Sequence, residues 1–258
     1  MFTPRLALAS LSGDADAAWA EFGATWAGAA FLGGICLDDP TREAAREMVA
    51  DRDRTEFLPP DPIAFIDEQL SALDGVAIRT GFNVRSTTVE PVRDAAAVAA
   101  DHGAMLEINA HCRQDELRAA GCGETLLRTP DRLAELVAAA SDTGADVSVK
   151  VRAELANVDL VSVSQRVEAA GADAVHVDAM DSEPVVADLV CDTGLFVIAN
   201  NGVRDRDTTQ EYLDYGADAV SVGRPSDDAE VLSRVNTAVT EWFDDGEAVG
   251  GRAGVTEP

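Results

Sequence analysis

Lysine is almost absent from this chain of 258 residues. Nineteen of its 20 basic residues are arginine, and the single lysine, Lys150, lies in the apolar segment 147–151. An ammonium group is costly to bury, and a buried lysine is commonly retained for its chemistry, as a compact cation or as an amine of tunable pKa. The scarcity of lysine therefore predicts that Lys150 is the centre of an active site.

Other absences limit the class of protein. The sequence has four cysteines but no CxxC pair and no zinc-ligand spacing, so we expect reduced thiols and no metal site. No stretch approaches about 18 consecutive apolar residues and no signal peptide is visible, which predicts a soluble cytoplasmic protein without a membrane partner. No GxGxxG pattern follows the first apolar segment, which argues against an open, doubly wound dinucleotide fold.

Basic residues are also few relative to acidic ones. The chain has 47 Asp and Glu against 20 Lys and Arg, a net charge of −27, yet 47% of its residues are hydrophobic. A core is therefore expected, beneath an acidic surface suited to high salt, and we interpret the source as a halophilic archaeon. Negative charge ordinarily argues against a nucleic-acid partner. In a salt-adapted protein it reflects the solvent as much as the partner.

Short apolar segments alternate with helical patterns along the chain, which favours parallel strands joined by helices. Glycine ends several helical patterns, at Gly103, Gly144, Gly171 and Gly216, where a left-handed residue closes the helix. Strands are expected at residues 5–10, 28–37, 76–84, 105–109, 146–152, 174–178, 195–200 and 217–223. Helices are expected at residues 91–101, 130–143, 161–170 and 208–215.

Eight such repeats predict one α/β domain, a (β/α)8 TIM barrel with parallel strands. We assign residues 1–243 to the barrel and residues 244–258 to a polar C-terminal tail. Segment 38–61, rich in Asp, Arg and Pro, is expected to be a helix–loop excursion after the second strand. The doubly wound open sheet is the alternative fold.

Polar residues occupy the inward face of several expected strands. Side chains alternate along a strand, so the valines of segment 146–152 face the helices and turn Ser148, Lys150 and Arg152 inward. The same alternation turns inward Glu107, Asn109, His111, His176, Asp178 and Ser221. Such a ring is either a self-satisfied ion layer or a ligand site at the C-terminal mouth. The clustering of these residues toward strand ends favours the ligand site.

Two strand ends predict a phosphate site. Asn200 and Gly202 follow the seventh expected strand, and Gly223 and Arg224 follow the eighth. Barrel phosphate sites are built from these two loops, because glycine lets backbone N–H groups approach the oxygens and arginine supplies a charged fork. The alternative is that the glycines serve only as turn residues.

Several short motifs between Glu107 and Arg224 together resemble the flavin-binding barrel of the tRNA-dihydrouridine synthases. Residues 109–113 resemble the family pattern Asn-x-Gly-Cys-Pro, and residues 149–152 resemble Val-Lys-Ile-Arg. Residues 121–127 match Gly-x-Gly-x-x-Leu-Leu, residues 171–173 match Gly-Ala-Asp, and residues 199–201 and 222–224 resemble the phosphate loops Gly-Asn-Gly and Ile-Gly-Arg. The motifs occur in family order across about half of the chain.

The resemblance implies FMN bound at the barrel mouth. By it, the Lys150 ammonium lies near the N1/O2 edge of the flavin, where a compact cation stabilises the charge of reduced flavin. The residues implied to contact the cofactor are Asn83, Asn109, Lys150, Asp178, Asn200, Gly202, Gly223 and Arg224, the last four at the phosphate or close to it.

The resemblance also implies a reaction, in which hydride passes from flavin N5 to C6 of a uracil ring while Cys112 donates a proton to C5. Cys112 and Lys150 are therefore the expected catalytic residues. The implied substrate is uridine in tRNA, and the expected electron donor is NAD(P)H. The residues expected to contact the substrate are Asn109, His111, Arg152 and His176.

Some positions depart from the family pattern. His111 and Arg113 replace the glycine and proline that flank the family's cysteine, Asn83 replaces a glutamine, and Asp178 stands where a histidine is expected. Only residues 224–258 follow the last strand, so the helical tRNA-binding domain of the family is not expected. These departures favour a divergent, minimal relative.

The residues leave three alternatives open. One is another FMN-dependent pyrimidine oxidoreductase, of the dihydroorotate dehydrogenase type. Another is a carbonyl lyase in which Lys150 forms a Schiff base and Glu107 or Asp178 carries protons. The third is a flavin- or RNA-binding protein without catalysis. The sequence does not predict an oligomeric state.

Overall fold

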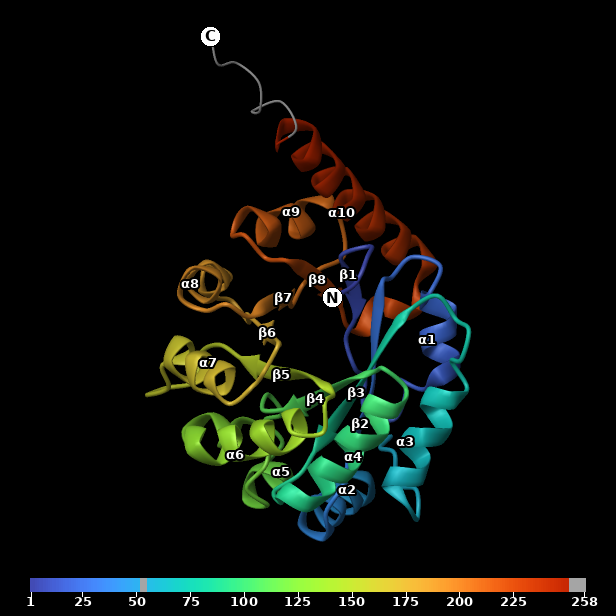
Figure 1. The fold of residues 1–258 in the computed structure, drawn as a ribbon, viewed down its shortest axis with the longest axis vertical. Coiled ribbons are helices and arrows are strands. Elements are labelled where there is room, and N and C mark those ends of the chain that lie inside the picture. Colours follow the sequence, from blue (N-terminus) through green and yellow to red (C-terminus); the bar gives the residue numbers. More distant parts are fainter. Residues whose placement is uncertain (52–54, 251–258) are drawn as a thin grey trace.

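A closed barrel of eight parallel strands forms the centre of the computed structural model, which describes residues 1–51 and 55–250 (Figure 1). The strands pair in chain order, and β1 also pairs with β8 to close the sheet. This arrangement confirms the predicted TIM barrel. The strands are β1 (Leu6–Leu8), β2 (Ala29–Cys36), β3 (Arg79–Arg85), β4 (Met105–Asn109), β5 (Asp146–Arg152), β6 (Ala174–Asp178), β7 (Phe196–Asn200) and β8 (Ala219–Val222).

Helices surround the sheet on its outer side (Figure 1). The longer ones are α1 (Ala17–Gly23), α2 (Asp39–Asp51), α3 (Pro62–Ser71), α4 (Val89–Asp101), α6 (Pro130–Ser141), α7 (Leu160–Ala169), α8 (Val185–Asp192), α9 (Arg206–Asp214) and α10 (Ala229–Gly250). Shorter ones lie after strand ends, namely α5 (Asp115–Ala119) and the 3-10 helices η1 (Gly123–Arg128) and η2 (Arg224–Asp227).

The acidic residues and the glycines define where helices begin and end. Asp61 and Asp205 accept hydrogen bonds from the first backbone N–H groups of α3 and α9, which satisfies donors that the helix itself leaves free. At the other end, the four predicted closing glycines all have positive φ, from 62° at Gly103 to 102° at Gly171. The predicted helix ends are therefore confirmed at these positions.

Strand bounds follow the apolar pattern closely. β4, β5 and β6 have the predicted residues, whereas β3 begins at Arg79 and not at the predicted residue 76. The Ile78 N–H group bonds to the Val76 carbonyl in a turn, so this part of the segment does not join the sheet. The outward-facing valines of β5 pack in the core between sheet and helices, together with Leu106 and Ile108 of β4, as the alternation predicted.

The N-terminal end of the barrel is closed by an apolar layer. Phe31, Met105 and Ile198 point inward and pack with small alanines from other strands, and Phe2 covers them from below. The Phe31 ring also lies 5.2 Å from the imidazole of His176, centroid to centroid. A polar layer therefore begins directly above this closed end.

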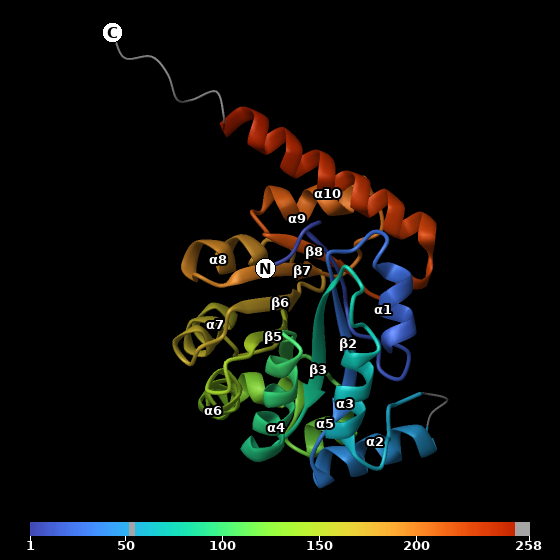
Figure 2. The ribbon, with the colours of Figure 1, turned by 45° about the vertical axis from the view of Figure 1, so that its right-hand side comes forward.

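Helix α10 crosses the outside of the barrel beside α9 (Figure 2). It continues to Gly250, so the predicted polar tail begins within this helix, and residues 251–258 lie outside the described residues. The predicted excursion 38–61 contains α2 and a loop whose residues 52–54 also lie outside them. In the described part of the chain, no helix combines the length and the apolar character that crossing a membrane needs.

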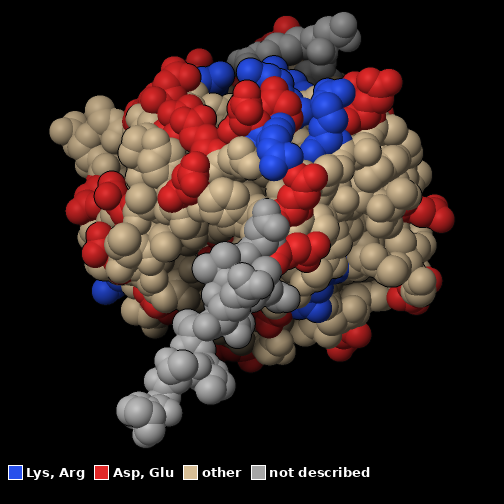
Figure 3. Space-filling model, turned by 90° about the horizontal axis from the view of Figure 1, so that it is seen from above, with Lys and Arg blue, Asp and Glu red and all other residues tan. Residues whose placement is uncertain are grey.

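On the side of α9 and α10, the molecular surface carries more acidic than basic side chains (Figure 3). Figure 3 shows acidic side chains spread over this face, with a group of basic side chains near its upper edge and a few others elsewhere. Like charges spread over a surface repel one another weakly where salt screens them, so this distribution agrees with the spread of acid along the sequence.

Shortening Phe31 tests the closed end of the barrel. Phe31 is fully buried, so Phe31→Ala should lower the free energy of unfolding by about 3–5 kcal/mol, through lost burial and the cavity that remains. Urea unfolding followed by circular dichroism measures the change. Phe22→Ala, at a ring that is 42% exposed, is the matched control and should cost less than about 1 kcal/mol. Equal effects would contradict the assigned packing.

Candidate active site

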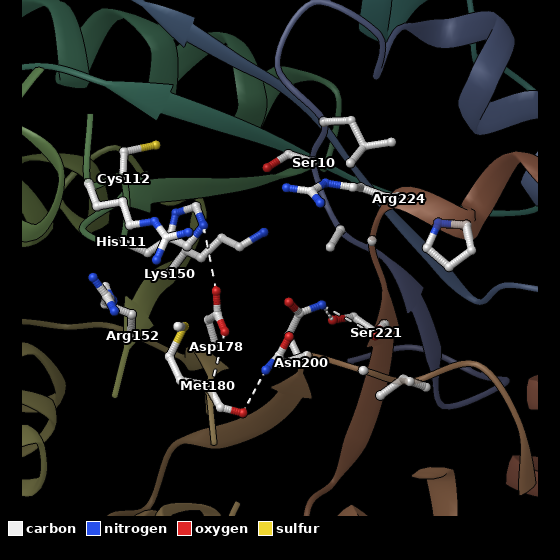
Figure 4. Close-up of a pocket in the computed structure, with 18 of the residues that line it drawn as sticks. Ser10, His111, Cys112, Lys150, Arg152, Asp178, Met180, Asn200, Ser221 and Arg224 are labelled. Carbon is white, nitrogen blue, oxygen red and sulfur yellow. Dashed lines mark hydrogen bonds and ion pairs between the residues drawn. The ribbon is translucent and has the colours of Figure 1, made fainter. Parts of the chain in front are cut away.

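A cavity of about 590 Å³ opens at the C-terminal ends of the strands (Figure 4). It lies at the mouth where barrel active sites are found and within the usual size range of ligand sites, about 300–1,000 Å³. The fold thus brings most of the predicted site residues to one place. Those that line the cavity are His111, Cys112, Lys150, Arg152, Asp178, Asn200, Gly202, Gly223 and Arg224.

Three predicted site residues lie beneath the cavity instead of lining it. Asn83 and His176 are fully buried and Asn109 is 2% exposed, and their polar atoms bond to other side chains of the barrel interior. The alternation of the strands predicted that Asn109 and His176 face inward, and they do. Their contact with a ligand stays a prediction.

Lys150 lies at the floor of the cavity, with its side chain directed into it (Figure 4). The residue is only 3% exposed, because the valines on either side anchor β5 in the outer core. Within residues 1–51 and 55–250, the Lys150 ammonium has no hydrogen-bond or ion-pair partner. A buried ammonium in this position favours a bound group that carries negative charge or electron density.

The cavity is rich in cations although the protein is acidic. Arg113, Arg204 and Arg224 line it besides Lys150 and Arg152, against the single carboxylate of Asp178. Sequence reasoning did not single out Arg113 or Arg204 for binding, although each closely follows a strand end. A ligand of this cavity is therefore expected to be anionic.

Arg152 forms an ion pair through one nitrogen of its guanidinium, while another of its nitrogens has no hydrogen-bond partner in the described structure. Its Nη1 bonds to Glu124 Oε2 at 2.7 Å, and Glu124 also pairs with Arg118 at 3.2 Å. The buried Nε of Arg152 has no hydrogen-bond partner in the described structure. The ion pair with Glu124 fixes the guanidinium at the cavity wall and leaves a donor available there.

The two predicted phosphate loops lie on the side of the cavity opposite Arg152 (Figure 4). Asn201 and Gly202 both have positive φ, and the Asn201 side chain bonds to the Met180 carbonyl at 2.6 Å, which fixes the loop after β7. A Cβ atom added to Gly223 would meet no atom within 4 Å, so open space adjoins this backbone. The loops thus offer room beside Arg224 for a phosphate.

Cys112 lies on the wall of the cavity, in the loop after β4, and is 4% exposed. The Asn109 side-chain oxygen accepts hydrogen bonds from the N–H groups of His111 at 3.2 Å and Cys112 at 3.1 Å. Gly123 packs so closely that an added Cβ would lie 2.3 Å from the Cys112 carbonyl oxygen. Both contacts hold the cysteine in a fixed position.

Arg85 is a residue that sequence reasoning missed. It is 1% exposed at the end of β3, pairs with the equally buried Glu56 at 2.7 Å, and lies 3.9 Å from Cys36 Sγ. No local pattern distinguishes this arginine from a surface one, because its partners are distant in sequence.

A chain of hydrogen bonds runs through the barrel interior below the cavity. Its centre is the Glu107 carboxylate, which contacts Asn83 Nδ2 at 2.7 Å through one oxygen and His176 Nδ1 at 2.7 Å through the other. Asn83 Oδ1 accepts from Asn109 Nδ2 at 2.9 Å, and His176 Nε2 lies 2.7 Å from Ser221 Oγ. Side chains from four different strands are joined in this way.

Burial determines the charges in this layer. It lowers the pKa of His176, which the Glu107 carboxylate offsets only in part, and it lowers the pKa of His111 well below its usual value with the help of the Lys150 charge. Burial alone would raise the pKa of Glu107, but His176 and the Lys150 ammonium outweigh it and leave that pKa below its usual value. Near pH 7 the carboxylate is therefore ionised and both imidazoles are neutral.

The sequence model of the dihydrouridine synthase (Dus) family matches residues 80–249, which is more than half of the chain. The chain belongs to the dihydrouridine synthase family. This confirms the resemblance seen in the sequence motifs, and it indicates a flavin-dependent oxidoreductase of the dihydrouridine synthase type. The chain is also similar to an uncharacterized protein of Methanocaldococcus jannaschii, with 26% identity over 204 residues that cover 75% of this chain and 78% of that protein.

The neutral histidines predict how stability depends on pH. Because the pKa values of His111 and His176 are lowered by folding, only the unfolded chain takes up these protons below about pH 6.5. The free energy of unfolding should therefore fall between about pH 6.5 and 5.5, by up to about 1.4 kcal/mol per pH unit for each histidine. Urea unfolding in concentrated salt measures this slope. His111→Gln should make it shallower by about half, and an unchanged slope would contradict the assignment.

Proposed function

We propose that this protein is an FMN-dependent oxidoreductase that reduces the C5=C6 bond of a uracil ring, with uridine in tRNA as the substrate. The observation that carries the proposal is the buried Lys150 ammonium, which faces the cavity without a partner among the described residues and shares that cavity with the Cys112 thiol. Family membership supports FMN as the group that accompanies this cation.

The residues present fit FMN. The Lys150 ammonium and the free Nε of Arg152 are donors that need an electron-rich partner, and the open space at Gly223 adjoins a loop of the kind that holds phosphate in barrels. Lys150 and Asp178 would lie at the flavin, above Asn83 and Asn109. Gly202, Gly223, Arg224 and Asn200 would hold the phosphate.

Bound FMN would supply the hydride that C6 of the ring receives. The chain's own part is to hold a proton at Cys112 Sγ for C5 and to keep bulk water away, which the burial of that residue achieves. His111, which is neutral, and Arg152 border the same space and would orient the pyrimidine. His176 would support them from the interior.

The remaining assignments complete this proposal. The protein would take electrons from NAD(P)H and act in the cytoplasm of a salt-adapted cell, where its acidic surface is screened from tRNA. The arginines at the cavity, in place of a basic outer surface, would provide attraction for the phosphate groups of the RNA near the target uridine.

Dihydrouridine mapping tests the function directly. In a strain that lacks this gene, we expect tRNA to lose dihydrouridine at one or more positions, and the wild-type gene should restore it. Cys112→Ala should fail to restore it because the proton donor is gone. Cys191→Ala, at an exposed thiol on α8, is the matched control and should restore it fully. Unchanged tRNA in the deletion strain would refute the tRNA substrate.

Lys150→Arg tests the role of the compact cation. The substitution keeps the charge, but the wide planar guanidinium would crowd the site, so we expect FMN reduction to slow by at least about tenfold. Stopped-flow absorbance with NAD(P)H measures this rate on the purified protein in concentrated salt. Arg46→Lys, an exchange of the same pair of residues at an exposed position, should leave the rate unchanged. A colourless wild-type protein that takes up no FMN would refute the cofactor.

A further inference from the structure

The direction of the buried hydrogen-bond chain follows from its two ends. At one end the backbone N–H groups of His111 and Cys112 can only donate, so Asn109 must present its side-chain oxygen to them. Its amide nitrogen then faces Asn83, which must accept with its own oxygen. Asn83 is left with its NH2 group facing Glu107, which therefore has to accept at this position.

The other oxygen of Glu107 likewise determines which atoms donate in the bonds to His176 and Ser221. A carboxylate has no donor, so His176 must carry its proton on Nδ1. His176 Nε2 then becomes an acceptor for the Ser221 hydroxyl, whose oxygen accepts from Asn200 Nδ2 at 2.6 Å. One acceptor-only group at position 107 thus accepts from two donors of this hydrogen-bond chain, one on β3 and one on β6.

These bonds have no competition from water. Asn83, Glu107 and His176 are fully buried, and Asn109 and Ser221 are 2% and 1% exposed. A reversed amide in this layer would leave two donors facing each other, which costs much more in a buried site than in water. The direction of the chain is therefore a fixed property of the fold.

We propose that Glu107 is a positioning residue, which acts through Asn83 and Asn109 to hold the Cys112 loop and at the same time fixes the proton of His176 on Nδ1. This inference rests on the proposed function for the role of Cys112 as proton donor. The fixed direction of the chain stands independently of that role. Glu107 does not line the cavity, so its effect on the reaction is transmitted and not direct.

The test moves the carboxylate from residue 107 to its hydrogen-bond neighbour, residue 83. Glu107→Gln introduces an NH2 group, so either His176 must shift its proton to Nε2 or the two asparagines must reverse and release the Cys112 loop. Adding Asn83→Asp restores an acceptor-only group. Residue 83 then accepts from Asn109 and from the new amide at position 107, whose oxygen again accepts from His176 Nδ1. Asn83→Asp alone instead places two carboxylates side by side in a buried site.

Nitrogen-15 NMR of the histidine side chains reads the proton position of His176, and assignment is simple because the chain has only three histidines. We expect Nδ1–H in the wild type, a loss of that signature in Glu107→Gln, and its return in the double variant. If the Nδ1–H signature instead persists in Glu107→Gln, the asparagines have reversed. Uracil reduction by the FMN-loaded protein should then fall at least about tenfold in this variant and recover to within about threefold of wild type in the double variant.

Ser148→Ala is the matched control. It removes the Ser148 hydroxyl, which lies 3.3 Å from Glu107 Oε2, the oxygen that also accepts from His176. Every donor and acceptor of the hydrogen-bond chain from Asn109 to Ser221 stays in place. The His176 signature should be unchanged and the turnover within about twofold of wild type. A loss of turnover in this variant equal to that of Glu107→Gln would show that any disturbance of the layer suffices, and would overturn the inference.

The outcomes separate this inference from the proposed function. A wild-type protein without uracil reduction refutes the proposed function. The NMR signature and the melting temperatures of the variants still test the direction of the hydrogen-bond chain. Full turnover in Glu107→Gln with an unchanged Nδ1–H signature overturns the inference alone. If Glu107→Gln fails to fold, the double variant must still fold with a melting temperature above that of either single variant, and its failure to do so would equally overturn the inference.

Discussion

The charge of Lys150 inside the barrel is the constraint on which the rest of the site depends. An ammonium held at 3% exposure needs negative charge nearby, and the Glu107 carboxylate in the layer below supplies it, as the lowered pKa of that group reflects. The carboxylate in turn needs donors, which Asn83 and His176 provide. The Lys150 ammonium is thus stabilised from below by the Glu107 carboxylate, while its other side faces the cavity, where a ligand can meet it.

This arrangement divides the barrel interior into layers with different tasks. The apolar layer at the closed end supplies burial and excludes water from below. The polar layer above it carries a hydrogen-bond chain whose direction is fixed, and the mouth presents the groups that a ligand meets. Precision at the mouth therefore depends on residues that no ligand touches.

Local patterns predicted the fold and the facing of the site residues well, because strand alternation and helix-closing glycines are read from neighbouring positions. They predicted the inward face of β4 to β6 but not depth along the strand. The structure places Asn83, Asn109 and His176 beneath the cavity, and their contact with a ligand stays a prediction. Arg85 was missed because its burial depends on Glu56, which only the folded chain brings to it.

Positive charge is distributed differently on the outer surface and in the cavity. In a chain of net charge −27, an arginine on the outer surface is surrounded by carboxylates, as the exposed pairs of Arg46, Arg166 and Arg206 illustrate. Asp178 supplies the only carboxylate among the described residues that line the cavity, and a cation enclosed there, such as Lys150, keeps its attraction because enclosure limits screening by salt. An acidic protein in concentrated salt can thus still bind an anionic ligand, provided that its cations are gathered in a cavity. Lys150, at the floor of that cavity, is where this attraction is screened least.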